Sequence, residues 1–197
     1  MRLAPLDLEG LLIDCIRLAA AAGHSNFQVG LCYPLGAQTR FTSDEGRIRQ
    51  IVTNLLGNAL KFTEEGHVIA HAAITVGGAK GTCLHLTIED TGRGVPLDKA
   101  EQIFQAFGQV GAPDSPAQEG TGLGLTISRG LAERMGGSLK LEKSDSDGSS
   151  FALRLPSRAD GAPAALPPLP ANVAVADAPG PQGNIVADRL TQGGGAQ

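Results

Sequence analysis

Two asparagines and a lysine recur along the stretch RIRQIVTNLLGNALKF, residues 47–62. Asn54, Asn58 and Lys61 are spaced four and three residues apart, which places them on one face of a helix. Asparagine is a mediocre helix former, so a helix that needed only solubility would carry Glu and Lys there. The amide oxygens beside a cation indicate a polar site able to bind a metal ion. A pair of asparagines that is capped or hydrogen-bonded within the helix is the alternative.

A second candidate site is IEDTGRG, residues 88–94, where an apolar strand ends in an acid and enters a glycine turn. Gly92 and Gly94 permit unusual dihedral angles and a close approach of the backbone to a ligand. Asp90, at the end of the strand, is well placed to accept a hydrogen bond from an exocyclic amine. Such acids are common in turns, so a purely structural turn is the alternative.

A third candidate site is EGTGLGL, residues 119–125, a glycine loop that runs directly into a predicted helix. Such a loop exposes backbone N–H groups at the positive end of the helix, which suits a polyphosphate. The loop is not a Walker A motif, because no Lys-Ser/Thr pair follows the glycines, and it is not a dinucleotide-binding fingerprint. A lone G-x-G pattern predicts little, so this loop gains meaning only from the other two sites.

The elements that must position these sites follow from hydrophobic spacing. Apolar residues three and four apart predict three long helices, over residues 8–22, 47–62 and 122–135. Ser43 or Asp44 caps the second of them. Runs rich in β-formers predict six strands, over residues 26–33, 39–42, 67–76, 82–89, 137–143 and 149–155. We expect the first two strands to form one hairpin and the next two to form another.

Between these elements, residues 97–107 are predicted to form a short helix and residues 108–119 a mobile loop. Helices and antiparallel strands interleave without a regular strand, helix, strand repeat. The predicted fold is therefore α+β, a two-layer α/β sandwich with three long helices on one face of a mixed, largely antiparallel sheet.

The domain is predicted to cover residues 1–156. From residue 157 to 197 the chain is rich in Ala, Pro and Gly and has no aromatic residue. Such a segment cannot bury enough apolar surface to offset the entropy of ordering it. We expect a disordered tail or linker there.

Composition excludes several classes of function. The formal net charge is -4 over 197 residues, and no block of Lys or Arg favours nucleic acid or a membrane surface as a partner. Cys15, Cys32 and Cys83 lie in apolar runs, which is typical of reduced core cysteines rather than of disulfides or a zinc site. No apolar run approaches the roughly 20 residues that span a bilayer, and no leader peptide is evident. We expect a cytoplasmic segment, although a parent protein can still be membrane-anchored.

In combination and in this order, the three sites resemble the catalytic ATP-binding domain of bacterial sensor histidine kinases. That domain has the Bergerat fold and belongs to the superfamily of gyrase B, Hsp90 and MutL. The matching segments are the N box RQIVTNLLGNALKF (49–62), the G1 box EDTGRGVP (89–96), the F box IFQAFGQ (103–109), the G2 box GTGLGLTISRGLAERMGG (120–137) and the closing GSSFALRLP (148–156). The resemblance covers residues 5–156, and the N and F boxes are most similar to those of hybrid histidine kinases.

The resemblance implies ATP and Mg²⁺ as cofactors. It makes Asn58 the direct Mg²⁺ ligand and gives Lys61 contact with the phosphates. Asn54 stands where hydrolysing relatives carry a Glu that activates water. Because an amide cannot accept a proton, hydrolysis should be slow and the γ-phosphate kept for another acceptor.

The resemblance also implies how adenine and the phosphates are held. Asp90 accepts the adenine amino group, Phe62 packs on adenine, and Gly92 and Gly94 let the backbone approach the base. Ser149 matches a position near adenine that often carries Thr. The phosphate end of the lid over ATP is formed by Gly120, Thr121, Gly122, Leu123 and Gly124. Phe104 and Phe107 either anchor the apolar side of this lid or simply pack in the core.

Two features depart from the family pattern. The lid segment PDSPAQE, residues 113–119, lacks the basic residues of many relatives, so charge neutralisation would rest on Mg²⁺, Lys61 and Arg93. None of the four histidines is followed by an acid, as a phosphoacceptor would be. The acceptor would therefore lie in a longer parent chain or on another protein.

These expectations define one function and two alternatives. The chain is predicted to bind Mg-ATP and donate the γ-phosphate to a histidine on a dimerisation domain, with a response regulator or receiver domain downstream. Alone it should not autophosphorylate. A catalytically silent nucleotide-binding switch or docking module is the first alternative. An ATP-hydrolysing MutL-type clamp is the second, and Asn54 argues against it.

Overall fold

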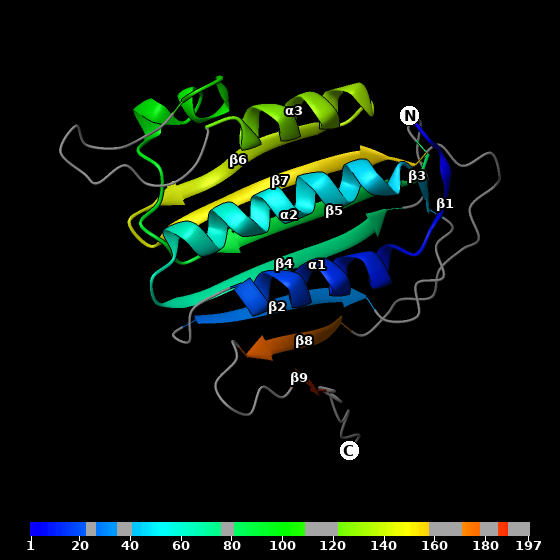
Figure 1. Cartoon of the computed structure of the whole chain (residues 1–197), viewed down its shortest axis with the longest axis horizontal. Coiled ribbons are helices and arrows are strands. Elements are labelled where there is room, and N and C mark those ends of the chain that lie inside the picture. The colour runs from blue at the N-terminus through cyan, green and yellow to red at the C-terminus, as the bar shows by residue number, and fades with distance from the viewer. Residues whose placement is uncertain are drawn as a thin grey trace, which may run out of the picture.

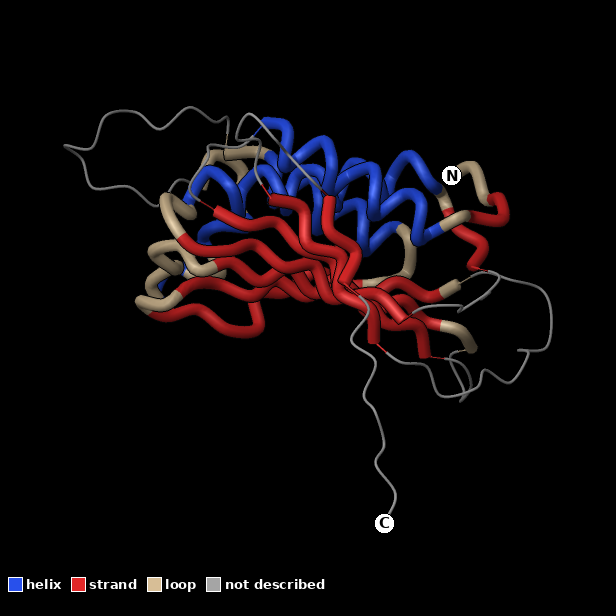
Figure 2. Tube along the Cα trace, turned by 90° about the horizontal axis from the view of Figure 1, so that it is seen from below, coloured by secondary structure: helices blue, strands red, loops and turns tan. Residues whose placement is uncertain are grey.

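The computed structural model describes residues 1–22, 27–34, 41–75, 81–108, 122–157, 171–177 and 185–188. Its three long helices are α1 (Leu8–Ala22), α2 (Glu45–Phe62) and α3 (Gly124–Arg134). They lie side by side on one face of a large sheet, with α2 in the middle (Figure 1). Figure 2 shows the same arrangement edge-on, as one layer of helices above one layer of strands. The predicted two-layer α+β fold is confirmed.

The sheet is mixed and largely antiparallel, as predicted. The described strands run in the order β6-β7-β5-β4-β2-β8-β9, and among them only the pair β2 and β4 is parallel. The bounds are β2 (Phe27–Pro34), β4 (Gly66–Thr75), β5 (Cys83–Asp90), β6 (Ser138–Asp145), β7 (Gly148–Pro156), β8 (Ala171–Asp177) and β9 (Ile185–Asp188). The predicted hairpin of β4 and β5 is confirmed, with Val68 opposite Asp90.

The core lies between the helices and the sheet. Helix α2 buries an apolar stripe at spacings of three and four, formed by Ile48, Ile51, Val52, Leu55, Leu56 and Ala59. Strand β5 alternates in burial, so that Leu84, Leu86 and Ile88 are fully buried beneath the helices. The apolar side chains that recur every 3.6 residues in α2 and every second residue in β5 therefore pack into the same core. Cys15 is buried in it, whereas Cys32 and Cys83 are only partly buried, and all three are free.

The predicted pairing of the first two strands is wrong. Strand β3 (Phe41–Ser43) pairs with β1 (Ala4–Leu6), a short strand that the sequence did not indicate, in a separate two-stranded sheet. Strand β2 cannot take β3 as a neighbour because β4 and β8 occupy its two edges. The backbone of β3 therefore finds its hydrogen bonds at the N-terminus of the chain.

The predicted short helix over residues 97–107 is also wrong. The structure has two short 3₁₀ turns there, η1 (Leu97–Lys99) and η2 (Gln102–Phe104). Of the residues between 98 and 107, all with described burial, only Ile103 and Phe104 are buried, which is too short an apolar stripe to hold an α-helix against the core. The predicted loop over residues 108–119 lies outside the described residues, except for Gly108.

The predicted disordered tail differs from the structure in two segments. Strand β8 pairs antiparallel with β2, from Gln28 opposite Asp177 to Pro34 opposite Ala171, and β9 pairs with β8. The sequence ANVAVAD alternates valine with small residues, and without β8 the strand β2 would present a row of unpaired backbone groups at the edge of the sheet. Apart from Ser157, the rest of the tail lies outside the described residues, and the domain boundary at residue 156 stays a prediction. Among the residues described, no helix is both long and apolar enough to cross a membrane.

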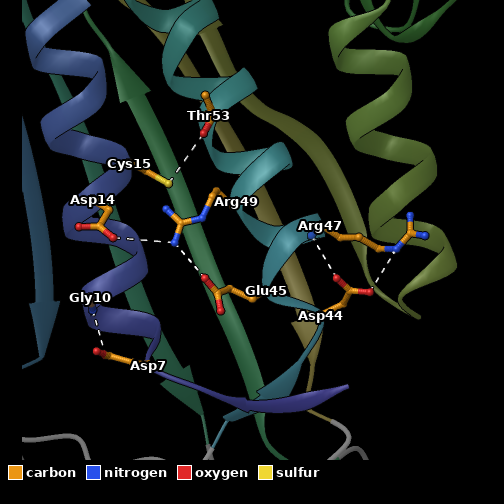
Figure 3. A network of polar contacts seen from close by, with 9 residues as sticks. All are labelled: Asp7, Gly10, Asp14, Cys15, Asp44, Glu45, Arg47, Arg49 and Thr53. Atoms are coloured by element: carbon orange, nitrogen blue, oxygen red, sulfur yellow. Dashed lines mark hydrogen bonds and ion pairs between the residues drawn. The ribbon is translucent and has the colours of Figure 1, made fainter. Parts of the chain in front are cut away.

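Polar contacts fix the position of α2, the helix that carries the asparagines (Figure 3). Arg49 Nη2 donates to Glu45 Oε1 at 2.9 Å and approaches Asp14 Oδ2 of α1 at 3.8 Å. The prediction left Ser43 or Asp44 as the N-cap, and the structure has Asp44 there. Its Oδ1 accepts from the Arg47 backbone N–H at 3.3 Å. The cap at Asp44 sets the start of α2, and Arg49 marks where α2 passes α1.

Replacing Asp44 with Ala is expected to destabilise the fold by about 1 kcal/mol, the usual value of such a cap. The backbone N–H groups of Arg2 and Arg47 lower the pKa of Asp44 below its ordinary 3.8. The contribution of Asp44 is therefore present above pH 3.8 and lost as the pH falls through the lower folded-state value. Urea unfolding at pH 7 and at low pH measures both effects. Asp14→Ala is the matched control, because Asp14 is exposed and its removal should change stability by less than about 0.5 kcal/mol. Equal losses for the two variants would contradict the capping role.

Candidate functional site

The outward face of α2 forms an open hollow of about 650 Å³. It is lined by Gly46, Arg49, Gln50, Thr53, Asn54, Gly57 and Asn58. Both predicted asparagines are therefore on its wall, and both are only half-buried. Two amide groups at an open surface of this size can reach a ligand, so the contacts that they already make decide what each can offer.

Asn54 connects α2 to the start of α3. Its Nδ2 donates to Ser128 Oγ at 2.9 Å. A Cβ on Gly124, the first residue of α3, would lie against Asn54 Oδ1, so only glycine fits there. The pattern did not indicate Ser128, although its position four residues after Gly124 places both on one helix face.

The N-terminus of α3 lies beside Asn54. Its N-cap residue, Leu123, makes no side-chain hydrogen bond to the first turn, and Gly122 has a φ of 65°. Backbone N–H groups that no side chain caps are available to an anion, and the helix dipole favours negative charge there. Gly120 and Thr121, the other predicted residues of this loop, lie outside the described residues.

Asp90 marks the opposite end of the site. It is only 5% exposed, and its Oδ1 accepts from the Gly92 backbone N–H at 2.9 Å. Burial raises the pKa of Asp90, while hydrogen bonds from the backbone N–H groups of Gly92 and Ser149 oppose this rise. Ser149, directly opposite on β7, is 6% exposed. The structure thus brings the two predicted adenine contacts together across neighbouring strands.

The glycine turn after Asp90 is locked to the end of α2. A Cβ on Gly92 would lie against the Phe62 carbonyl oxygen, and that oxygen accepts from the Arg93 backbone N–H at 3.4 Å. Gly94 has a φ of 68°, a conformation that favours glycine. Helix α2 therefore joins the two ends of the site, because Asn54 and Phe62 are separated by about 12 Å of helix.

Two cations lie against the ring of Phe62. Lys61 Nζ is 5.1 Å and Arg93 Cζ is 5.0 Å from the ring centroid. Both groups are within the range of a cation-π interaction. Lys61 is not among the residues that line the hollow, so its predicted contact with phosphate stays a prediction, as does the packing of Phe62 on adenine.

The two phenylalanines of the F box have different environments. Phe104 is buried, packs edge-on against Phe151 with ring centroids 6.3 Å apart, and carries Arg129 over its ring at 4.7 Å. Phe107 is 74% exposed and has a φ of 63°, which is rare for a bulky residue. Core packing, one of the two interpretations of this pair, therefore applies to Phe104 and not to Phe107.

The residues at both ends fit a magnesium nucleotide. Amide oxygens suit a hard cation, the uncapped start of α3 suits phosphate, and a buried acceptor suits an amino group. Thr63, the C-cap of α2, is also buried, and its Oγ1 has no hydrogen-bond partner among the residues described. No motif or spacing in the sequence indicates Thr63.

Comparison with known proteins agrees with this geometry. Residues 43–159 match the family described as histidine kinase-, DNA gyrase B-, and HSP90-like ATPase. The sensor protein GacS of Pseudomonas syringae pv. syringae is 38% identical over 159 residues, which is 77% of this chain and 17% of that protein. The sensory/regulatory protein RpfC of Xanthomonas campestris pv. campestris is 45% identical over 114 residues, which is 57% of this chain and 16% of that protein.

Solved structures agree with the fold. Full-length ShkA in complex with AMPPNP superposes with a TM-score of 0.68 at 34% identity, covering 82% of this chain and 32% of that one. The catalytic domain of the histidine kinase ThkA has a TM-score of 0.59 at 23% identity, over 80% of this chain and 99% of that one, and so supports the fold. This chain spans less than a fifth of the length of GacS and RpfC. The match over residues 43–159 shows that the chain belongs to the histidine kinase-, DNA gyrase B- and HSP90-like ATPase family.

Proposed function

We propose that this chain is the ATP-binding catalytic domain of a sensor histidine kinase of hybrid type. It binds Mg-ATP and donates the γ-phosphate to a histidine on a dimerisation domain. One observation carries the proposal: α2 places Asn54 and Asn58 on one hollow, holds Asn54 against the uncapped start of α3, and at Phe62 meets the turn after Asp90. The likeness to GacS and to ShkA, which was solved with AMPPNP, supports the same activity.

Asn58 and Asn54 have different roles at the phosphate end of the site. The Asn58 amide oxygen would hold Mg²⁺, which neutralises phosphate charge when bound. Asn54 cannot accept a proton, and its Nδ2 already donates to Ser128 Oγ. It therefore positions the start of α3 and does not activate water. Slow hydrolysis in the absence of an acceptor follows from this arrangement.

The adenine end supplies specificity. Asp90 Oδ1 is already hydrogen-bonded to Gly92 N–H, and the carboxylate has further lone pairs for an amino group. Guanine presents a carbonyl oxygen where adenine presents its amino group, so a buried carboxylate would face an acceptor. Such a mismatch leaves both groups without a donor, which predicts a preference for ATP over GTP.

The partners follow from the proposed reaction. The acceptor histidine belongs to a dimerisation domain, either in the same parent protein or on another chain, and a response regulator or receiver domain follows. His67, His71 and His85 lie in strands β4 and β5, away from a helical acceptor position. We place the domain in the cytoplasm, whether or not its parent protein is membrane-anchored.

Phosphoryl transfer can be tested with the parent protein's dimerisation domain supplied as a separate chain. With γ-labelled ATP and Mg²⁺, label should appear on that domain and not on this chain. The control is the same domain with its acceptor histidine replaced by alanine. Nucleotide binding without any labelling would instead support the silent switch or docking module. Steady release of phosphate without a partner would support the clamp-type ATPase.

A further inference from the structure

The end of the β6–β7 hairpin, residues 144–149, is fastened to the turn that follows Asp90. Ser144 Oγ accepts from the Val95 backbone N–H at 2.6 Å. A Cβ on Gly94 would lie against the Asp145 carbonyl oxygen, and a Cβ on Gly148 would lie against the Asp90 carbonyl oxygen. With a φ of 135° at Gly148, no other residue fits this approach. The hairpin end and the turn therefore form one unit.

The Ser144 hydroxyl has three nearby hydrogen-bond partners. A serine hydroxyl donates one proton and accepts two hydrogen bonds. The Val95 N–H donates to one acceptor site of the Ser144 hydroxyl. The proton of that hydroxyl has two possible acceptors. Ser149 Oγ lies at 3.1 Å and the Gly148 carbonyl oxygen lies at 3.5 Å, at the limit for a hydrogen bond. Either hydroxyl could be the donor in the 3.1 Å contact, and donation from Ser144 to Ser149 is the direction that does not use the longer contact to Gly148.

This donation decides what Ser149 can offer a ligand. If Ser149 accepts from Ser144, its own proton remains available for donation. If Ser149 donated to Ser144 instead, it could only accept from a ligand. Ser149 is 6% exposed and pairs across the sheet with Asp90, so its hydroxyl belongs to the same buried end of the site.

We propose that Ser144 is a positioning residue for recognition of the nucleobase. It donates to Ser149 and holds the Val95 N–H, so that Ser149 presents a donor beside the acceptor Asp90. A donor next to an acceptor matches adenine, whose amino group adjoins a ring nitrogen that accepts, and opposes guanine, whose corresponding groups are reversed. This role rests on the proposed function, because it assigns a residue within the same ATP site.

The test is the equilibrium binding of ATP and GTP by the full chain with substitutions at residues 144 and 149. Ser144→Ala should weaken ATP binding about tenfold, the effect of one hydrogen bond of ordinary strength, with a smaller effect on GTP. Ser144→Cys, a weak donor of similar size, should behave like Ser144→Ala, whereas Ser144→Thr keeps the hydroxyl and should bind ATP as the wild type does. Ser146→Ala is the matched control, because Ser146 is exposed in the same hairpin and bonds only to Asp147 among the described contacts.

A double-mutant cycle separates positioning from simple support of the fold. If Ser144 acts through Ser149, Ser144→Ala should add little to the effect of Ser149→Ala. Full additivity, or equal losses of ATP and GTP binding with a lowered melting temperature, would assign Ser144 a structural role only and overturn the proposal. Unchanged ATP binding by Ser144→Ala would also overturn it, while leaving the proposed function in place. Absence of ATP binding by the wild type would overturn the proposed function, and this role with it.

Discussion

Replacing Asn58 with alanine is expected to abolish the Mg²⁺-dependent binding of ATP. Asn58 lines the hollow on the outer face of α2, one turn beyond Asn54, and is only half-buried. Loss of an outer-shell partner alone costs a metal site 10–100-fold in affinity, so loss of a direct ligand should exceed about 100-fold. Isothermal titration with ATP, in Mg²⁺ and in excess chelator, measures the effect. The variant should bind equally weakly in both.

Gln50 provides the matched control for this substitution. It lines the same hollow on the same helix, two turns before Asn58, and is exposed. Gln50→Ala should keep both the affinity for ATP and its dependence on Mg²⁺. Because neither side chain belongs to the core, both variants should melt close to the wild type. If Asn58→Ala retained the dependence on Mg²⁺, the metal would have to be held elsewhere.

Replacing Asp90 with alanine is expected to remove the preference for ATP over GTP. A hydrogen bond to a charged group contributes about 1.5–3 kcal/mol, so ATP affinity should fall by roughly 10- to 150-fold while GTP affinity changes little. Competition against a fluorescent adenine nucleotide and a fluorescent guanine nucleotide gives both values. Glu89→Ala is the control, because Glu89 is the preceding residue, points to the other face of β5 and is paired with His71 at 3.7 Å. A preserved ATP preference in Asp90→Ala would place adenine elsewhere.

The pH dependence of ATP binding follows from the same carboxyl group. Burial raises the pKa of Asp90 above its ordinary 3.8. Only the ionised form presents all its lone pairs as acceptors, so ATP affinity should decline as the pH falls through this raised value. For folding the sign is opposite: the raised pKa favours the protonated native state at low pH, and this contribution is lost as the pH rises through the folded-state value.

The sequence predicted the elements that carry strong periodicity. The stripe of α2 and the alternation of β4 and β5 are determined locally, and the structure confirms them because one core satisfies both patterns. The partner of β3 could not be predicted, because it depends on which edges of β2 other strands occupy. Strand β8 was missed for a related reason, since a free sheet edge is visible only once the sheet has been assembled.

Residue types and order predicted much of the candidate site, and the contacts between those residues required the structure. Asn54 and Asn58 come from one motif and Asp90 and Gly92 from another, and the chemistry of each motif could be recognised individually. Ser144 could not, because serine in a hairpin is common and its importance arises only from the approach of Val95 and Ser149.

Thermal unfolding of the wild-type chain with ATP and Mg²⁺ tests the central claim most directly. At a ligand concentration 100 times Kd, binding adds about 2.7 kcal/mol to stability, which raises the melting temperature by several degrees in a protein of this size. We predict such a rise with ATP and Mg²⁺ and a much smaller one with GTP and Mg²⁺. An unchanged melting temperature with ATP and Mg²⁺ at millimolar concentrations would contradict the assignment of this site to ATP.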